Sequence, residues 1–312
     1  MERVLLMVFG PALLGLVAAL AVWLIARPRS SRPAVSGAVR WSTLAGVLLA
    51  SGIVLAQLLL GTTLVGFPLR SPTALMMTSF TAPLIAGLIA VVLLMVPVVR
   101  RSGDGTAELH RRTLTSFGSR WWFLTLAGAV LLVVLATVWP GLASVPDDQG
   151  RYTMYWIDMG PGSSMGSTIY GWYFSRPSLA LVVLLVVAGL VVVWLISRPP
   201  LAPDREHDVA VRRWRTRNVL AMATGALLLH LARVVDSLAG TASIYGQTQT
   251  DQGLFTTRTP FAALEGPLRV AADILEAGAW LLWFTVLLIA VTRSARTRDD
   301  GAVRSSWRSA SS

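Results

Sequence analysis

The sequence contains no cysteine and no lysine, and only 14% of its residues are charged. Without cysteine, disulfides, thiolate metal sites and lipid anchors on cysteine are excluded. Without lysine the chain cannot form a retinal Schiff base, which excludes a light-driven seven-helix pump. Only His230 of the three histidines falls in an apolar stretch, which excludes a bis-histidine haem within a membrane.

Long apolar stretches make up most of what is present. Hydrophobic residues form 54% of the chain, and the mean hydropathy is +0.63. A helix needs about 20 apolar residues to cross a bilayer. The sequence therefore predicts an all-α, polytopic membrane protein with seven transmembrane helices, at about 4–25, 42–64, 79–99, 121–139, 177–196, 218–238 and 270–292.

The 27 arginines are distributed unevenly and account for the net charge of +11. Most lie in alternate connections, at 27–40, 100–120, 198–217 and 293–308. The positive-inside rule places these segments in the cytoplasm and the N-terminus outside. The same pattern indicates contact with the lipid bilayer and argues against nucleic acid. We expect a multi-pass protein of a cell membrane, of the bacterial inner-membrane type, with solvated basic connections.

Two parts of the chain resemble each other and predict an internal repeat. The segments 22–28 and 193–199 read VWLIARP and VWLISRP, and AVR followed by Trp comes after each at similar distances. Similar short matches continue into the following helices. The alternative is that both segments share only the usual end of a helix at the inner interface, with tryptophan and then arginine.

A parallel repeat of three helices requires one extra helix to carry the chain back across the membrane. The predicted organisation is therefore three helices, one bridging helix and three more. It divides the chain into a first repeat (1–105), the bridging helix with an outer aromatic loop (106–176), a second repeat (177–295) and a disordered, basic cytoplasmic tail (296–312).

Charged residues cluster in the outer half of the second repeat. The sixth span carries His230, Arg233 and Asp236, spaced three apart on one side of a helix. The seventh carries Asp273 and Glu276, with Arg269 at its mouth. Ionisable groups at this depth are costly unless they are paired. We expect Arg233 to pair with Glu276 or Asp273, and Arg269 with Asp273.

Two interpretations of this charge cluster remain open. It either lines a polar pocket, facing the outer side, that binds a solute or passes protons, or it is a structural clamp between two helices. The corresponding first-repeat positions are uncharged: Gln57 for His230, Thr63 for Asp236 and Thr81 for Asp273.

The outer loop before the fifth span is rich in aromatic residues. Such side chains can cap a cavity, bind a partner or lie on lipid headgroups. The candidates for this outer surface are Tyr152, Tyr155, Trp156, Trp172 and Tyr173.

No enzyme motif is present: the sequence has no HExxH, no Walker motif and no GxSG. We therefore expect no enzyme, no metal and no cofactor. The leading hypothesis is a transport-type protein or permease subunit that binds a small solute at the charge cluster. It would work with other membrane subunits, and any ATP-driven activity would need a separate ATPase. The alternatives are a non-catalytic accessory or assembly subunit of a larger membrane complex, or a membrane sensor.

Overall fold

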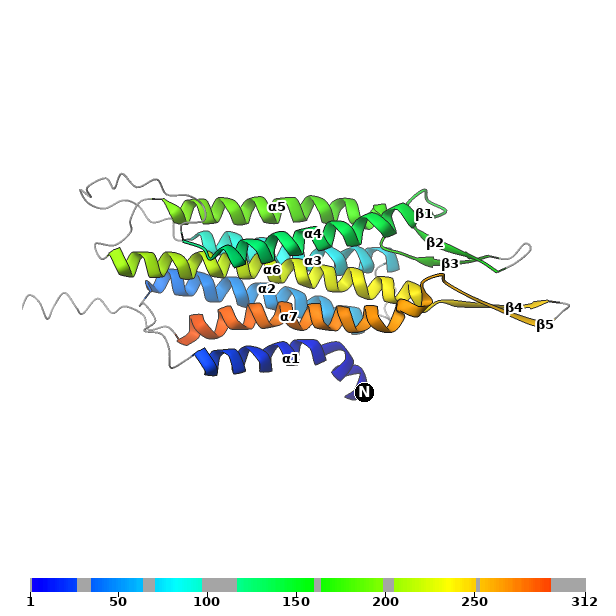
Figure 1. Ribbon diagram of the computed structural model, residues 1–312, viewed down its shortest axis with the longest axis horizontal. Coiled ribbons are helices and arrows are strands. Elements are labelled where there is room, and N and C mark those ends of the chain that lie inside the picture. Colours follow the sequence, from blue (N-terminus) through cyan, green and yellow to red (C-terminus); the bar gives the residue numbers. More distant parts are fainter. Residues whose placement is uncertain are drawn as a thin grey trace, which may run out of the picture.

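A computed structural model of the chain describes residues 2–26, 35–63, 71–96, 117–159, 164–198, 205–250 and 253–292. The predicted C-terminal tail, 296–312, lies outside these ranges. Within them, seven long helices run side by side (Figure 1). They are α1 (Glu2–Ala26), α2 (Gly37–Thr63), α3 (Pro72–Met95), α4 (Arg120–Ala143), α5 (Trp172–Ser197), α6 (Arg205–Ala242) and α7 (Glu265–Thr292).

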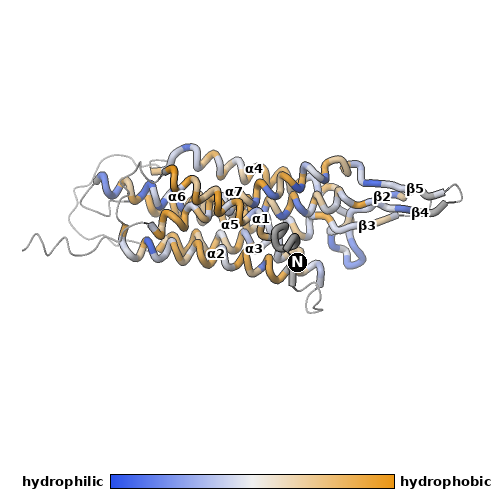
Figure 2. Tube along the Cα trace, turned by 90° about the horizontal axis from the view of Figure 1, so that it is seen from below, coloured by the Kyte–Doolittle hydropathy of each residue, from blue (hydrophilic) through white to orange (hydrophobic). Residues whose placement is uncertain are grey.

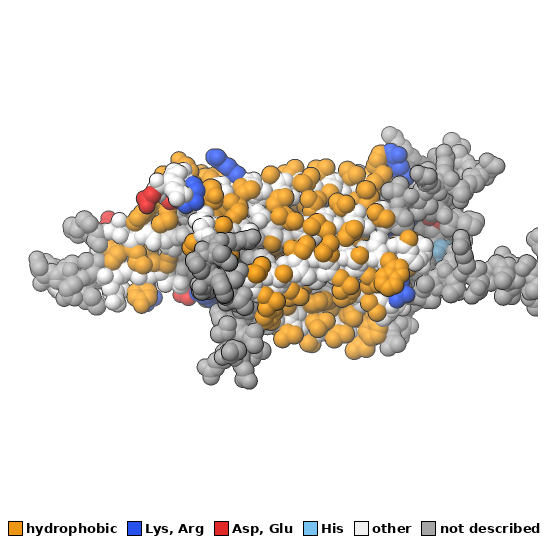
Figure 3. Space-filling model, turned by 180° about the vertical axis from the view of Figure 1, so that it is seen from behind, with side chains coloured by type: hydrophobic (Ala, Val, Ile, Leu, Met, Phe, Trp, Pro, Cys, Tyr) orange, Lys and Arg blue, Asp and Glu red, His pale blue; other side chains and the backbone are white. Residues whose placement is uncertain are grey.

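The helices have the lengths and the apolar surface of membrane-spanning segments. Six of them, α2 to α7, are long and apolar enough to cross a bilayer, and the described apolar part of α1, Phe9–Ile25, is shorter. Apolar residues fill the middle of the bundle, and hydrophilic ones gather towards its two ends (Figure 2). On the face seen in Figure 3, hydrophobic side chains cover this middle zone. The protein is a polytopic α-helical membrane protein, as the sequence predicts.

Helix α3 begins earlier in the chain than predicted. The Ser71 side chain accepts a hydrogen bond from the amide of Ala74 at 3.3 Å, and Pro72 occupies the first helical turn. A serine cap followed by proline is a favourable helix start, because it satisfies amides that have no partner inside the helix. The helix ends at Met95, two residues before Pro97 in the sequence. The predicted span of 79–99 is therefore shifted towards the C-terminus.

Helix α6 is the central element of the bundle. It packs against α3, α4, α5 and α7. Most of its middle is buried inside the protein, unlike the lipid-facing helix α4. Around it, α1 packs on α7, α2 on α3 and α7, and α5 on α3. A polar side chain on α6 therefore meets protein on almost every side.

The loops expected at the outer end contain two small antiparallel sheets, so the chain is not purely α-helical. One sheet has the order β1 (Val145–Pro146), β2 (Tyr152–Asp158), β3 (Ser164–Thr168). The other is a hairpin of β4 (Tyr245–Thr250) and β5 (Gly253–Arg258). Both extend from the same end of the bundle, where α1 begins (Figure 1).

The side chains of β2 alternate as they do in a strand with one covered face. Thr153 and Ile157 are buried, whereas Tyr152 and Trp156 are exposed. Aromatic and β-branched residues suit such a surface. The strands were missed in the sequence because segments this short, rich in glycine, serine and glutamine, carry only a weak alternating pattern.

At the opposite end, the expectation of a solvated basic connection is wrong for the start of α6. This helix begins at Arg205, and two of its arginines, Arg212 and Arg215, are buried. Arg212 pairs with Asp208 at 2.8 Å and donates to the carbonyls of Ile196 and Arg198 at the end of α5. A cation there satisfies carbonyls that have no partner inside the helix.

Arg215 makes the same kind of contact with another helix. Its guanidinium donates to the carbonyls of Leu94 and Met95, at the end of α3, at 3.2 and 3.3 Å. The two arginines therefore join the ends of α5 and α3 to α6. They are buried because the ends of α5 and α3 cover the start of α6.

Two close helix crossings depend on glycine. A Cβ atom at Gly87 of α3 would lie 2.3 Å from the Cβ of Ala226 in α6. One at Gly15 of α1 would lie 2.5 Å from the Cβ of Trp280 in α7. Small residues let helix backbones approach closely, which is the usual source of helix association in a membrane.

Replacing Gly87 with leucine should push α3 away from α6. Overpacking of a close contact typically costs about 1–3 kcal/mol. We expect Gly87→Leu to lower the midpoint of thermal unfolding of the purified protein in detergent. The matched control is Gly128→Leu on α4, where a Cβ meets nothing within 4 Å. Equal midpoints for the two variants would contradict the close crossing.

Candidate functional site

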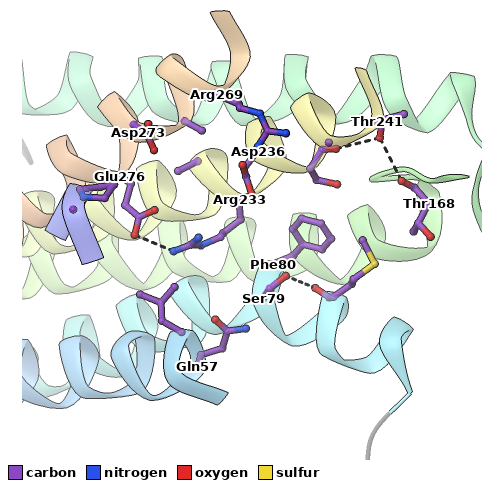
Figure 4. Close-up of a pocket in the computed structure, with 18 of the residues that line it drawn as sticks. Gln57, Ser79, Phe80, Thr168, Arg233, Asp236, Thr241, Arg269, Asp273 and Glu276 are labelled. Atoms are coloured by element: carbon purple, nitrogen blue, oxygen red, sulfur yellow. Dashed lines mark hydrogen bonds and ion pairs between the residues drawn. The ribbon is translucent and has the colours of Figure 1, made fainter. Parts of the chain in front are cut away.

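A cavity of about 870 Å³ lies in the half of the bundle nearest the sheets. Its wall is formed by residues of α1, α2, α3, α6 and α7, together with the end of β3. Figure 4 shows the charged side chains of α6 and α7 on one side and Gln57 and Ser79 on the other. The cavity therefore lies between helices of the first and second halves of the chain. Its volume is typical of a small-molecule site.

An ion pair joins α6 to α7 at the cavity wall. Arg233 Nη2 donates to Glu276 Oε1 at 2.9 Å (Figure 4). The same carboxylate oxygen accepts a hydrogen bond from Trp280 Nε1 at 3.4 Å. The side chain of Glu276 is 9% exposed and that of Arg233 19%. The predicted pairing of Arg233 with Glu276 is confirmed.

Arg269 pairs with a different acid from the one predicted. Its guanidinium lies 3.4 Å from Glu265, four residues earlier in the chain, instead of contacting Asp273, four residues later. Side chains on a helix lean towards its N-terminus, and an acid that precedes arginine by four residues is the more favourable order. Sequence spacing alone does not distinguish the two acids, whereas side-chain direction does.

Asp236 and Asp273 remain as carboxylates without a cation. Both line the cavity, from α6 and from α7, and both are exposed. Within the described residues, neither forms an ion pair. The two arginines of the cavity wall are already engaged by Glu276 and Glu265. The wall therefore carries an excess of negative charge.

His230 does not belong to the cavity. It is fully buried, with Nδ1 2.8 Å from the carbonyl oxygen of Phe80 and Nε2 3.4 Å from the Tyr170 hydroxyl. The Phe80 carbonyl only accepts, so Nδ1 carries the hydrogen and Nε2 accepts from Tyr170. This arrangement ties α6 to α3 and to the segment that follows β3. His230 was predicted to belong to the same cluster as Arg233 because the two residues are three apart on one helix. The sequence does not reveal which neighbouring helix each of them faces.

The first-half counterparts have different places. Gln57 lines the cavity opposite the acids. Thr81 donates to the carbonyl of Met77, in its own helix, at 2.8 Å and is not among the cavity residues. Thr63 is the last residue of α2, and its side chain lies outside the described part.

Sequence reasoning missed several cavity residues that carry no charge. Ser79 and Phe80 of α3 line it, as do Ser237 of α6 and Thr168 of β3. Pro83 was a usable signal for Ser79, because proline has no amide hydrogen to offer the carbonyl four residues earlier. Thr168 could not be found, since its position depends on how β3 folds back over the helices.

The end of β3 is fixed over the cavity by hydrogen bonds and aromatic packing. Thr241 at the end of α6 donates to the Thr168 carbonyl at 3.3 Å. Just beyond β3, the buried ring of Tyr170 packs edge-on against Phe80, with centroids 4.6 Å apart. Because Phe80 and Thr168 both line the cavity, the sheet and the cavity form one connected structure.

The predicted aromatic surface separates into exposed and packed residues. Tyr152 and Trp156 are exposed on the outer face of β2. Tyr155 lies on the other face and packs edge-on against Phe261, with centroids 5.7 Å apart. Trp172, at the start of α5, lies against Gly141 of α4.

The fifth aromatic residue, Tyr173, lies beside a charged turn between β1 and β2. Arg151 lies 5.4 Å from its ring centre and donates to Asp147 at 2.8 Å. The hydrogen bond from the Arg151 side chain is the main reason why the pKa of Asp147 is lowered to about 2. The amides of Gln149 and Arg151 also donate to this carboxylate, each at 2.9 Å. These contacts hold the turn at the base of the first sheet.

Comparison of the chain with models of protein families, with curated proteins and with solved structures finds no match. Function therefore has to be argued from the site. Among the described residues no group of three or more histidine and acidic side chains is placed to hold a metal ion.

The Arg233–Glu276 pair should be essential for stability. Removing one partner of a buried ion pair costs about 3–5 kcal/mol, because the other charge remains buried without a partner. We expect Arg233→Ala and Glu276→Ala each to lower the thermal midpoint strongly, and the double exchange Arg233→Glu with Glu276→Arg to recover part of it. Arg269→Ala is the control, since its pair with Glu265 is 42% exposed on both sides and such pairs contribute about 0–1 kcal/mol. A double exchange no more stable than the single variants would rule out simple pairing.

The Asp147 turn should lose its support in acid. A carboxylate with a lowered folded pKa stabilises the fold above its unfolded pKa of about 3.9 and loses this contribution as the pH falls further. At pH 5, we expect the amides of Gln149 and Arg151 to exchange hydrogen more slowly than in the Asp147→Asn variant. This difference should disappear as the pH falls from about 4 to 2. Protection that does not change over this range would contradict the assigned role of Asp147.

Proposed function

We propose that this protein is a transport-type membrane protein, a permease or a permease subunit, that binds a small solute in the cavity between its two halves. The observation that carries this proposal is the cavity of about 870 Å³, with two carboxylates on its wall that have no ion-pair partner in the described part of the chain. Charged groups within a membrane protein usually mark a solute or ion path. A purely structural clamp needs only the Arg233–Glu276 pair, and neither a cavity nor further acids.

The direction in which the cavity faces follows from the distribution of arginine. In the sequence, the segments rich in arginine precede α2, α4 and α6 and follow α7, and the described helix ends that border them lie at the end opposite the sheets (Figure 1). The positive-inside rule places that end in the cytoplasm. The cavity, the two sheets and the start of α1 then face the outside of the cell membrane, and the solute binds from there.

A repeated architecture is supported by which helices pack together. In the proposed repeat, α1 corresponds to α5, α2 to α6 and α3 to α7. The contact between α1 and α7 then corresponds to the contact between α5 and α3. Likewise, α2–α3 corresponds to α6–α7, and α2–α7 to α6–α3. These three correspondences are expected from two parallel repeats around an axis along the membrane normal, with α4 outside the repeat, whereas the packing of α5 on α6 has no equivalent between the described parts of α1 and α2. Such repeats are common in transporters, which bind solutes at the interface of the two copies.

The two proposed copies contribute different chemistry to the cavity. The first supplies the uncharged side chains of Gln57 and Ser79, and the second supplies Asp236, Asp273 and the Arg233–Glu276 pair. Only the second of the two proposed copies carries charged side chains at the cavity between them, so the two copies have diverged at this site. This asymmetry favours a site that orients its solute.

An accessory or assembly subunit is the second candidate, and the outer sheet favours it. Tyr152 and Trp156 are 46% and 50% exposed on the outer face of β2. Exposed aromatic residues of this kind are enriched at protein interfaces. In this alternative another membrane subunit covers the sheets, and the cavity binds no solute. A separate ATPase is required in either case if the protein works with ATP.

The absence of cysteine gives a direct test of the cavity. In cells that express Ser79→Cys, a membrane-impermeant maleimide added from outside should label the protein, because the cavity connects Ser79 with the outer solution. Gln247→Cys on the exposed strand β4 should be labelled, and Ser51→Cys, buried in α2, should not. Labelling of Gln247→Cys alone, with the protein folded, would exclude the solute-binding function and favour the accessory subunit.

A further inference from the structure

We infer that the cavity selects a small organic cation. This inference rests on the proposed function and names the chemical class of its solute. Asp236 and Asp273 present two carboxylates to the cavity, and neither has an ion-pair partner among the described residues. A cavity whose wall is of low polarity concentrates ions of the opposite sign. A positively charged nitrogen in the cavity supplies the missing counter-charge.

The arginines of the wall do not offset this preference. Arg233 is held by Glu276 at 2.9 Å, and Arg269 by Glu265 at 3.4 Å. An anionic solute that contacts Arg233 would have to separate it from Glu276, and one that contacts Arg269, whose pair with Glu265 is exposed, would still face Asp236 and Asp273. Leaving a buried carboxylate such as Glu276 without its cation is costly. The cavity therefore discriminates against anions.

The hydroxyl groups near the wall leave the carboxylates as the groups that select the solute. Ser79 donates to the Met76 carbonyl of its own helix at 2.7 Å. The Ser237 Oγ atom, next to Asp236 in the chain, is covered by protein atoms, so a solute in the cavity does not reach it. The charge preference of the cavity therefore rests on Asp236 and Asp273.

Further acceptors lie across the cavity. Pro83 cannot donate to the carbonyl of Ser79, which leaves that oxygen without its usual helical donor. The side-chain oxygen of Gln57 lies on the same wall. A solute with several N–H groups meets oxygen acceptors on both sides. Such a site is built for a donor-rich cation.

The apolar part of the wall favours an organic cation over a metal ion. Leu14, Leu58, Met76 and Phe80 line the cavity with the polar groups. Such residues contact the carbon atoms of a ligand and offer nothing to a bare ion. Among the described residues no set of three histidine or acidic groups is arranged to hold a metal. The solute therefore carries a charged nitrogen on a small carbon skeleton.

Charged thiol reagents test this selectivity in the cysteine-free chain. The cationic probe is 2-(trimethylammonium)ethyl methanethiosulfonate, and the anionic probe is its 2-sulfonatoethyl analogue. For each of Ser79→Cys and Gln247→Cys, the rate with the cationic probe is divided by the rate with the anionic probe. We expect this ratio to be about tenfold higher for Ser79→Cys, because a charged cleft raises the local concentration of counter-ions about 10- to 1,000-fold.

Two neutralised variants assign the effect to the acids. Asp236→Asn and Asp273→Asn, each added to Ser79→Cys, should lower the ratio towards that of Gln247→Cys. Asp148→Asn, on an exposed turn outside the cavity, is the control and should leave the ratio unchanged. Ethanolamine hydrochloride at millimolar concentration, whose ammonium group carries three N–H donors, should also slow the labelling of Ser79→Cys more than sodium chloride at equal concentration.

The outcomes separate this inference from the function on which it rests. If neither probe reaches Ser79→Cys, the proposed solute-binding function is wrong. If both probes react and the ratio equals that of Gln247→Cys, the cavity is open but does not select cations. If sodium slows the labelling as much as ethanolamine does, the preference is for charge alone, and the assignment to an organic cation is overturned.

Discussion

The need to pair polar groups inside a membrane decides how this bundle is assembled, and the Arg233–Glu276 ion pair is its clearest expression. The two side chains meet at 2.9 Å across α6 and α7, and Trp280 donates to the same carboxylate oxygen. Neither helix could carry its charge into the bilayer alone, because an unpaired ionisable group there is strongly unfavourable. The pair therefore fixes the rotation of both helices about their axes, and this places Asp236 and Asp273 on the cavity wall.

The same constraint explains why α6 lies at the centre. Several of its polar side chains meet a neighbour: Arg212 and Arg215 reach the ends of α5 and α3, and His230 reaches the Phe80 carbonyl. A helix with so many donors could not face lipid. The apolar helices α4 and α5, which have no buried ionisable side chain, take the outer positions instead.

The outer sheets link this core to the surface. The end of β3 closes over the cavity through Thr168, and Tyr170 carries the connection to His230 and Phe80. A solute that reaches the cavity would contact groups from the helices and the sheet together. Figure 4 shows that the labelled charged side chains come from α6 and α7, so these two helices dominate the electrostatics of the site.

The sequence by itself determined the membrane class, the approximate spans and the expectation that Arg233 pairs with an acid of the last span, Glu276 or Asp273. These follow from local properties: the length of apolar stretches, and two opposite charges at depths where neither can remain alone. Only the tertiary structure decided that His230 faces α3, that Arg269 turns back to Glu265, and that the outer loops form sheets. The direction of a side chain around a helix depends on its neighbours, and a sequence does not specify which helices those are. The cavity follows from the same information, because its wall combines residues of five helices and one strand that lie far apart in the chain.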